Sequence, residues 1–126
     1  MNKVLSKSKL ILASPRGFCA GVERAVEILQ RAIDLLGAPV YVKHEVVHNK
    51  YIIEDFEKKG VIFIEDINSI PDEAVLIYSA HGVSNKIKEI AKKKNLKIFD
   101  ATCPLVTKVH LQVHKYARPN IDVVLI

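Results

Sequence analysis

The two cysteines of this chain, Cys19 and Cys103, lie in similar sequence settings. Each follows a short apolar run typical of a strand and precedes an apolar pattern typical of a helix. A cysteine at the start of a helix lies beside free backbone N–H groups and the positive end of the helix dipole, and both favour thiolate over thiol. Thiolates ligate metals and act as nucleophiles. We therefore expect Cys19 and Cys103 to form one shared site.

Three histidines also follow predicted strands: His44 and His48 follow one, and His81 follows another. Soft thiolates together with proton-bearing imidazoles suit a metal and an anion. Three glycines nearby would let the backbone approach a ligand without a Cβ clash, namely Gly17, Gly21 and Gly82. His44 precedes an acidic residue and is expected to be exposed or to support a neighbouring ligand. Another pair of histidines, four residues apart on a predicted helix, is expected on the surface: His110 and His114.

Strands and helices are predicted to alternate along the chain, and this positions the cysteines and histidines. Strands are expected at residues 10–13, 40–43, 61–64, 74–80, 96–100 and 121–126, and helices at 21–36, 49–59, 84–94 and 104–118. This alternation predicts an α/β fold with a mostly parallel sheet flanked by helices on both faces. Ligands of such sheets bind beyond the carboxyl ends of the strands, where the cysteines and histidines are expected to lie.

Length and composition fit a globular domain. The chain has 126 residues, of which 49% are hydrophobic and 26% are charged. No apolar run approaches the ~18 residues of a membrane span, and the apolar stretch after the basic start is too short for a signal-peptide core. We therefore expect a cytoplasmic protein with no membrane partner. In that compartment, cysteines are more often ligands or redox groups than disulfides.

The net charge of +5 owes much to lysines on and after the predicted helix at residues 84–94. These lysines are expected to form a solvated helix face. Aromatic residues that could stack on bases do not interleave with them, so no nucleic-acid partner is expected. The positive field would still attract an anionic small molecule.

The cysteines and histidines are also compatible with simpler roles. A single cysteine near a sheet is usually a small buried hydrophobic residue, and a single loop histidine is usually solvated. Cys19 and Cys103 with two histidines would also make a zinc- or iron-binding module without redox chemistry. The chain could also be a remnant of a longer protein that has lost its function. Residue types and spacing alone leave these alternatives open.

Four segments resemble, in the same order, the motifs of the IspH/LytB family of 4-hydroxy-3-methylbut-2-enyl diphosphate reductases. They are PRGFCAGVERA at 15–25, VKHEVVHN at 42–49, SAHGVS at 79–84 and DATCPLVTKVH at 100–110. The resemblance extends from about residue 10 to residue 110. Four long motifs in a fixed order are a specific signature.

The resemblance implies the last step of the non-mevalonate isoprenoid pathway. Two electrons and two protons remove the allylic hydroxyl of the diphosphate substrate, which gives isopentenyl and dimethylallyl diphosphate. The family uses a [4Fe–4S] cluster held by three cysteines, and Cys19 and Cys103 match the first two. His48 and His81 match two of the histidines that hold the diphosphate. The implied electron donor is a ferredoxin or a flavodoxin.

Three further elements of the family pattern have no counterpart in this chain. They are the third cysteine, the third diphosphate histidine and the proton-relay glutamate, so the catalytic acid stays unassigned. The family fold has three similar α/β units, and we expect residues 1–102 to form the first and 103–126 to begin a truncated second. The chain ends on an apolar, core-type strand. We therefore expect a shortened protein that is inactive alone and that is marginally stable or self-associating.

Overall fold

The structure, a computed structural model, describes residues 9–124. Its sheet has four parallel strands in the order β2-β1-β3-β4. The strands are β1 (Val40–Lys43), β2 (Val61–Ile64), β3 (Val75–Tyr78) and β4 (Lys97–Asp100). In register, Val40 of β1 lies between Val61 of β2 and Val75 of β3. The predicted α/β class with a parallel sheet is confirmed.

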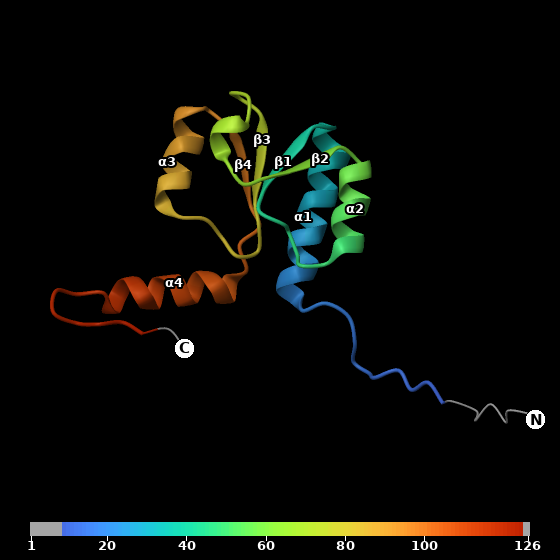
Figure 1. Ribbon diagram of the computed structural model, residues 1–126, viewed down its shortest axis with the longest axis horizontal. Coiled ribbons are helices and arrows are strands. Elements are labelled where there is room, and N and C mark those ends of the chain that lie inside the picture. The colour runs from blue at the N-terminus through green and yellow to red at the C-terminus, as the bar shows by residue number, and fades with distance from the viewer. Residues whose placement is uncertain (1–8, 125–126) are drawn as a thin grey trace, which may run out of the picture.

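Helices lie on both faces of this sheet, as the alternating pattern predicts (Figure 1). The helices are α1 (Ala20–Leu36), α2 (Lys50–Lys58), α3 (Asn85–Lys93) and α4 (Pro104–Tyr116), with a short 3₁₀ turn, η1 (Ile67–Ser69). Helices α1 and α2 cover one face, and α3 and η1 cover the other. Helix α4 extends away below the sheet.

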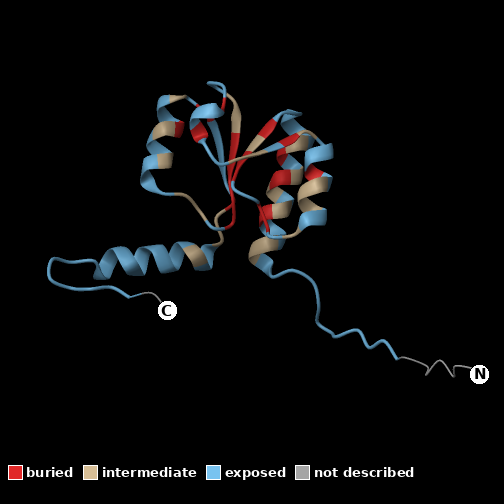
Figure 2. Ribbon diagram, viewed as in Figure 1, coloured by how far each residue is buried: buried red, intermediate tan, exposed pale blue. Residues whose placement is uncertain are grey.

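Each face has its own hydrophobic core because side chains alternate along the strands. On β1, Val40 and Val42 point to the face of α1 and α2, whereas Tyr41 packs with the second core. The first core buries Leu29 of α1 and Phe56 of α2. The second core joins α3 and η1 to β3. Most of the buried surface therefore lies between residues 25 and 101 (Figure 2).

Helix boundaries follow from capping residues in the sequence. The Asn49 side chain accepts hydrogen bonds from the Tyr51 and Ile52 N–H groups at the start of α2. Ser84 accepts one from Ile87 N–H at the start of α3, as its position predicts. Gly37 ends α1 with a φ of 75°, a left-handed conformation that favours glycine.

Two predicted strands are wrong. Residues 10–13 are exposed and form no strand, and neither do residues 121–124 at the other end; residues 125 and 126 of the second prediction lie outside the described part. An apolar run becomes a strand only when a neighbouring strand completes its backbone hydrogen bonds. Within residues 9–124, neither segment pairs with β2 or β4, the two edges of the sheet.

Helix α4 is the least buried helix of the described chain. All of its residues are exposed or half-buried, in contrast to α1 (Figure 2). Its apolar residues include Leu105, Leu111 and Tyr116, and all three are exposed. Strand β4 precedes α4 in the chain and is an exposed edge strand. The cysteine between β4 and α4 therefore lies at the boundary of the packed part.

Candidate functional site

The two cysteines come together at the starts of two helices. Cys19 is the N-cap residue of α1, and Cys103 is the N-cap residue of α4. Their sulfurs lie close to one point beside Gly21. A Cβ built on Gly21 would lie 2.7 Å from Cys103 Sγ and 3.9 Å from Cys19 Sγ. The expected approach of the two cysteines is confirmed, although Cys19 follows an irregular segment and not the predicted strand.

Hydrogen bonds hold the loop that carries Cys103. The Cys103 N–H donates to the Ala80 carbonyl at 2.9 Å, which ties the loop to the end of β3. The Asp100 carboxylate accepts from both the backbone N–H and the hydroxyl of Thr102. From the other side, the Arg24 guanidinium of α1 donates to the Thr102 carbonyl at 3.2 Å. The cysteine loop therefore bridges β3 and α1.

The two predicted diphosphate histidines are neighbours. The ring centroids of His48 and His81 lie 5.0 Å apart, with the planes tilted by 34°. His48 Nδ1 lies 3.3 Å from a carboxylate oxygen of Glu45, and His81 Nδ1 lies 3.5 Å from the Ser79 hydroxyl. Both imidazoles are exposed. Two neighbouring imidazoles at the carboxyl edge of the sheet can donate N–H groups to the oxygens of one anion.

A second polar cluster surrounds His44, at the end of β1. His44 Nδ1 lies 2.7 Å from a Glu65 carboxylate oxygen, and Lys43 Nζ lies 2.9 Å from His44 Nε2. The Lys43 side chain is only 6% exposed, and its ammonium also reaches Glu65 at 3.4 Å. The pKa of the Glu65 carboxyl lies below its usual value, chiefly because of the hydrogen bond with His44. His44 has a φ of 62°, a strained conformation for a residue other than glycine.

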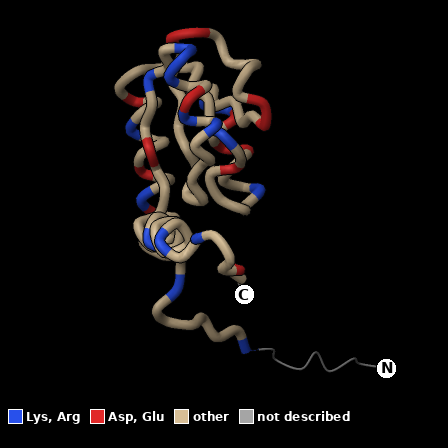
Figure 3. The backbone as a smooth tube through the Cα atoms, turned by 90° about the vertical axis from the view of Figure 1, so that its left-hand side faces the viewer, with Lys and Arg blue, Asp and Glu red and all other residues tan. Residues whose placement is uncertain are grey.

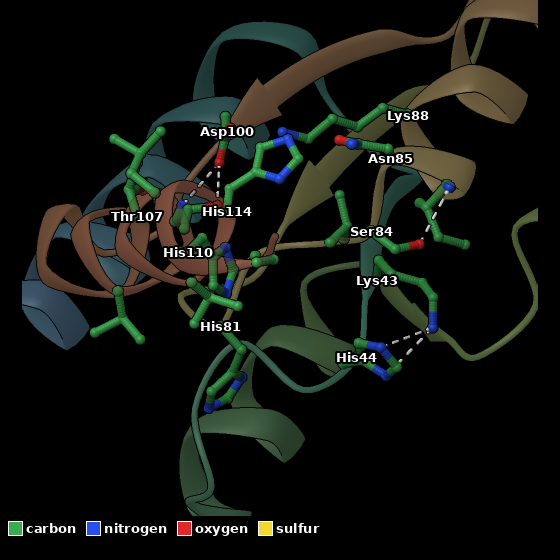
Figure 4. Close-up of a pocket in the computed structure, with 18 of the residues that line it drawn as sticks. Lys43, His44, His81, Ser84, Asn85, Lys88, Asp100, Thr107, His110 and His114 are labelled. Carbon is green, nitrogen blue, oxygen red and sulfur yellow. Dashed lines mark hydrogen bonds between the residues drawn. The ribbon is translucent and has the colours of Figure 1, made fainter. Parts of the chain in front are cut away.

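His81 and the Lys43–His44–Glu65 cluster line an open groove of about 900 Å³ between the carboxyl edge of the sheet, the start of α3, and α4 (Figure 4). Basic, acidic and imidazole side chains share it: Lys43, His44, Glu65, His81, Lys88, Asp100, His110 and His114. His110 and His114 are exposed, as predicted, yet they face this groove. The ring of His110 lies against Gly82, where an added Cβ would come within 3.2 Å of His110 Cε1.

The lysines predicted to form a solvated face are exposed, apart from the half-buried Lys94. Lys94 pairs with Asp72 at 3.1 Å. Figure 3 shows basic and acidic residues interspersed over the packed part of the chain. The groove itself has mixed charge, because both lysines and carboxylates line it.

The cysteine pair fits part of an iron–sulfur ligand set. Thiolate sulfur is the ligand that such clusters usually take, and the sulfurs of Cys19 and Cys103 both lie within 4 Å of one point. Within residues 9–124, no three His, Cys, Asp or Glu side chains lie close enough to hold a metal ion by themselves. The residues that would hold such a cluster here are Cys19 and Cys103, which are two of the thiolates it would need.

The fold and the two pairs of side chains define the class of protein. It is an α/β protein with a cysteine pair and a histidine pair at the carboxyl edge of a parallel sheet. The chain belongs to the LytB family, because the family model described as "LytB protein" matches residues 10–126.

Curated relatives agree with this assignment. The chain is 56% identical over 117 residues to the 4-hydroxy-3-methylbut-2-enyl diphosphate reductase of Xanthomonas axonopodis pv. citri (strain 306). The same identity holds for the reductase of Xanthomonas oryzae pv. oryzae (strain PXO99A). In both comparisons, the aligned region covers 93% of this chain and 37% of the relative. The chain therefore spans about a third of the length of these relatives.

Solved structures are similar in fold. The E-1-hydroxy-2-methyl-but-2-enyl-4-diphosphate reductase from Plasmodium falciparum matches with a TM-score of 0.81 and 55% identity, over 86% of this chain and 34% of that one. A second structure is described as (E)-4-hydroxy-3-methyl-but-2-enyl diphosphate reductase, the terminal enzyme of the non-mevalonate pathway. It matches with a TM-score of 0.70 and 31% identity, over 86% of this chain and 39% of that one.

Sequence reasoning missed the Lys43–His44–Glu65 cluster. The available signal was a lysine that ends an apolar strand and a histidine directly after it, with a carboxylate directly after the next strand. It also left out the contact of Arg24 with the Cys103 loop, because residues so far apart in sequence give no local pattern. Within the described residues, no helix combines the length and apolar character needed to cross a membrane.

Proposed function

We propose that this chain forms the N-terminal part of a 4-hydroxy-3-methylbut-2-enyl diphosphate reductase. The reaction is the reductive removal of the allylic hydroxyl, which gives isopentenyl and dimethylallyl diphosphate. The observation that carries the proposal is the LytB match over residues 10–126, together with the convergence of Cys19 with Cys103 and of His48 with His81. Within this proposal, residues 1–102 form the first α/β unit and residues 103–126 begin a second.

Each pair has its own role in this proposal. Cys19 and Cys103 hold two positions of a [4Fe–4S] cluster, which supplies electrons to the substrate when it is bound. The imidazoles of His48 and His81 bind oxygens of the diphosphate, since charge-assisted hydrogen bonds are the strong ones. Glu45 and Ser79 lie at the Nδ1 atoms and orient the two rings. Electrons arrive from a ferredoxin or flavodoxin in the cytoplasm.

A chimera tests this function directly. Residues of this chain replace the matching 117 residues of the Xanthomonas axonopodis reductase, which leaves the rest of that relative unchanged. After anaerobic reconstitution with iron and sulfide, we expect the chimera to convert 4-hydroxy-3-methylbut-2-enyl diphosphate to its two products. Cys103→Ser should abolish turnover and lower the bound iron. Thr107→Ser, on the same helix, is the matched control and should retain turnover.

The histidine role has its own readout in the same chimera. His81→Ala should weaken diphosphate binding at least ~10-fold, because it removes a charge-assisted hydrogen bond. Arg31→Gln is the control, because Arg31 is a basic residue of α1 that pairs with Glu27 and does not line the groove. Unchanged substrate affinity in the His81 variant would contradict the assigned role. A folded chimera that binds iron but yields no product would contradict the proposed reaction and favour a metal-binding module.

A further inference from the structure

Gly21 lies on the side of α1 that faces Cys103. It is the second residue of α1, two positions after Cys19. A Cβ at this position would lie 2.7 Å from Cys103 Sγ and 3.2 Å from Cys103 Cβ. Real Cβ atoms essentially never show contacts shorter than 3.0 Å. The Cys103 thiol therefore occupies the volume that any side chain at position 21 would need.

The backbone does not explain this glycine. Gly21 is not among the positive-φ glycines of the described chain, and it lies within a regular helix. Alanine is the better residue for a helix, both in backbone entropy and in intrinsic propensity. The space left for Cys103 Sγ is thus the feature of the structure that favours glycine at this position.

Arg24 makes a second contact on the same side of α1. Residues three apart on a helix share a face, so Arg24 lies on the same side of α1 as Gly21 and faces the Cys103 loop. Its guanidinium donates to the carbonyl of Thr102, the residue before Cys103, at 3.2 Å. On its other side, the loop is fixed by the bond from Cys103 N–H to the Ala80 carbonyl. Helix α1 therefore holds the loop at two points, one steric and one polar.

We propose that Gly21 and Arg24 are positioning residues that set the distance between the Cys19 and Cys103 sulfurs. Gly21 admits the Cys103 thiol to the first turn of α1, next to Cys19. Arg24 holds the loop so that the thiol stays there. The inference takes from the proposed function only the assignment of the two cysteines to one site.

A trivalent arsenical measures this distance without iron or substrate. Phenylarsine oxide binds two thiols at once when they lie close together, and this chain has two cysteines. We expect the 126-residue chain to bind it at least ~100-fold more tightly than Cys19→Ser or Cys103→Ser, because the second bond is intramolecular. Gly21→Ala should lose at least ~10-fold of this affinity. The reaction of each single thiol with iodoacetamide should stay within about twofold, which separates spacing from thiol reactivity.

A matched pair of arginine variants covers the case in which Gly21→Ala does not fold. Arg24→Gln should weaken arsenical binding about fivefold, since one hydrogen bond to the loop is lost. Arg31→Gln is the control, because Arg31 lies on the same helix and pairs with Glu27 at 2.6 Å, away from the loop. The control should bind the arsenical as the unmodified chain does. Circular dichroism of each variant reports whether α1 is intact.

Two results would overturn the inference. One is a folded Gly21→Ala variant that binds the arsenical as tightly as the unmodified chain. The other is equal binding by Arg24→Gln and Arg31→Gln. Neither result bears on whether the chimera turns over substrate. Conversely, a chimera without turnover leaves a reduced arsenical affinity of Gly21→Ala as support for the positioning role.

Discussion

Helices α1 and α4 are both amphipathic, but only the apolar face of α1 is buried. Leu29 of α1 is fully buried against the sheet, whereas Leu111 of α4 is 64% exposed. The difference lies in the partners, since α1 packs on strands that the same chain provides, and α4 extends away from them (Figure 1). An apolar periodicity therefore predicts a helix and its apolar face, but not what covers that face.

The candidate site lies where these two regions meet. Cys19 begins the packed helix α1, and Cys103 begins the exposed helix α4. The cysteine pair thus depends on contacts across the boundary, from Gly21 and Arg24 of α1 to the loop before α4. Four experiments compare the packed part of the chain with α4 and the loop before it. They are given from the largest expected effect to the smallest.

Amide hydrogen exchange should show the greatest contrast. Strands β1 and β3 lie inside the sheet and carry buried side chains, so their amides should exchange only on global unfolding. Helix α4 has 13 residues, and an exposed helix of this length is marginal in water. We expect protection in β1 and β3 to exceed that in α4 by about 10³-fold or more. Similar protection in both regions would remove the distinction.

Truncation of matched leucines should show the same contrast in stability. Leu29→Ala removes a fully buried side chain from the first core and should lower the free energy of unfolding by about 2–5 kcal/mol. Leu111→Ala, on the exposed helix, should change it by less than about 0.5 kcal/mol. Urea denaturation of both variants provides the measurement. Equal losses would mean that α4 is packed as tightly as α1.

Loss of a helix cap should have a smaller effect. The Asn49 side chain accepts two backbone hydrogen bonds at the start of α2, so Asn49→Ala should cost about 1 kcal/mol in unfolding free energy. Cys19→Ala is the comparison, because Cys19 is an N-cap without a side-chain hydrogen bond to its helix. It should cost less than about 0.5 kcal/mol. A larger loss at Cys19 than at Asn49 would contradict the capping assignments.

The weakest expected effect is the pH response of Glu65. Its pKa is lowered mainly by the hydrogen bond with His44, so the contact stabilises the fold above the unfolded pKa of about 4.3. This stabilisation is lost as the pH falls through the folded pKa. His44→Ala should raise the Glu65 pKa toward its usual value in a carbon-13 titration. His114→Ala, on α4, should leave it unchanged, and a shift in that control would place α4 closer to Glu65.

Local sequence signals predicted the four observed strands and the four α-helices to within a few residues. Asn49, Ser84 and Gly37 act at or beside the predicted helix ends. The prediction failed at residues 10–13 and 121–124, where an apolar run lacks a neighbouring strand in the described chain. Strand pairing depends on the whole sheet, so the local sequence of an apolar run does not show whether a partner strand is present.

For the site, matching motifs predicted which residues would meet, but not how they are held. The meeting of Cys19 with Cys103 was predicted from their positions at helix starts, although the predicted strand before Cys19 is absent, and the choice of His48 with His81 came from the family resemblance. The buried Lys43 beside His44 and the reach of Arg24 to Thr102 could not be predicted, because they depend on tertiary geometry. The roles of the two pairs as ligands of a cluster and a diphosphate stay predictions.

Turnover of the 126-residue chain alone tests most directly whether its cysteine pair and histidine pair suffice for the reaction. In that proposal, the chain contributes two thiolates and two imidazoles to a site that needs further ligands and an acid. After anaerobic reconstitution with iron and sulfide, and with a strong one-electron donor, we predict no product from 4-hydroxy-3-methylbut-2-enyl diphosphate. Under the same conditions the Xanthomonas axonopodis relative serves as the positive control. Measurable product from this chain alone would contradict the proposal that the site needs further ligands.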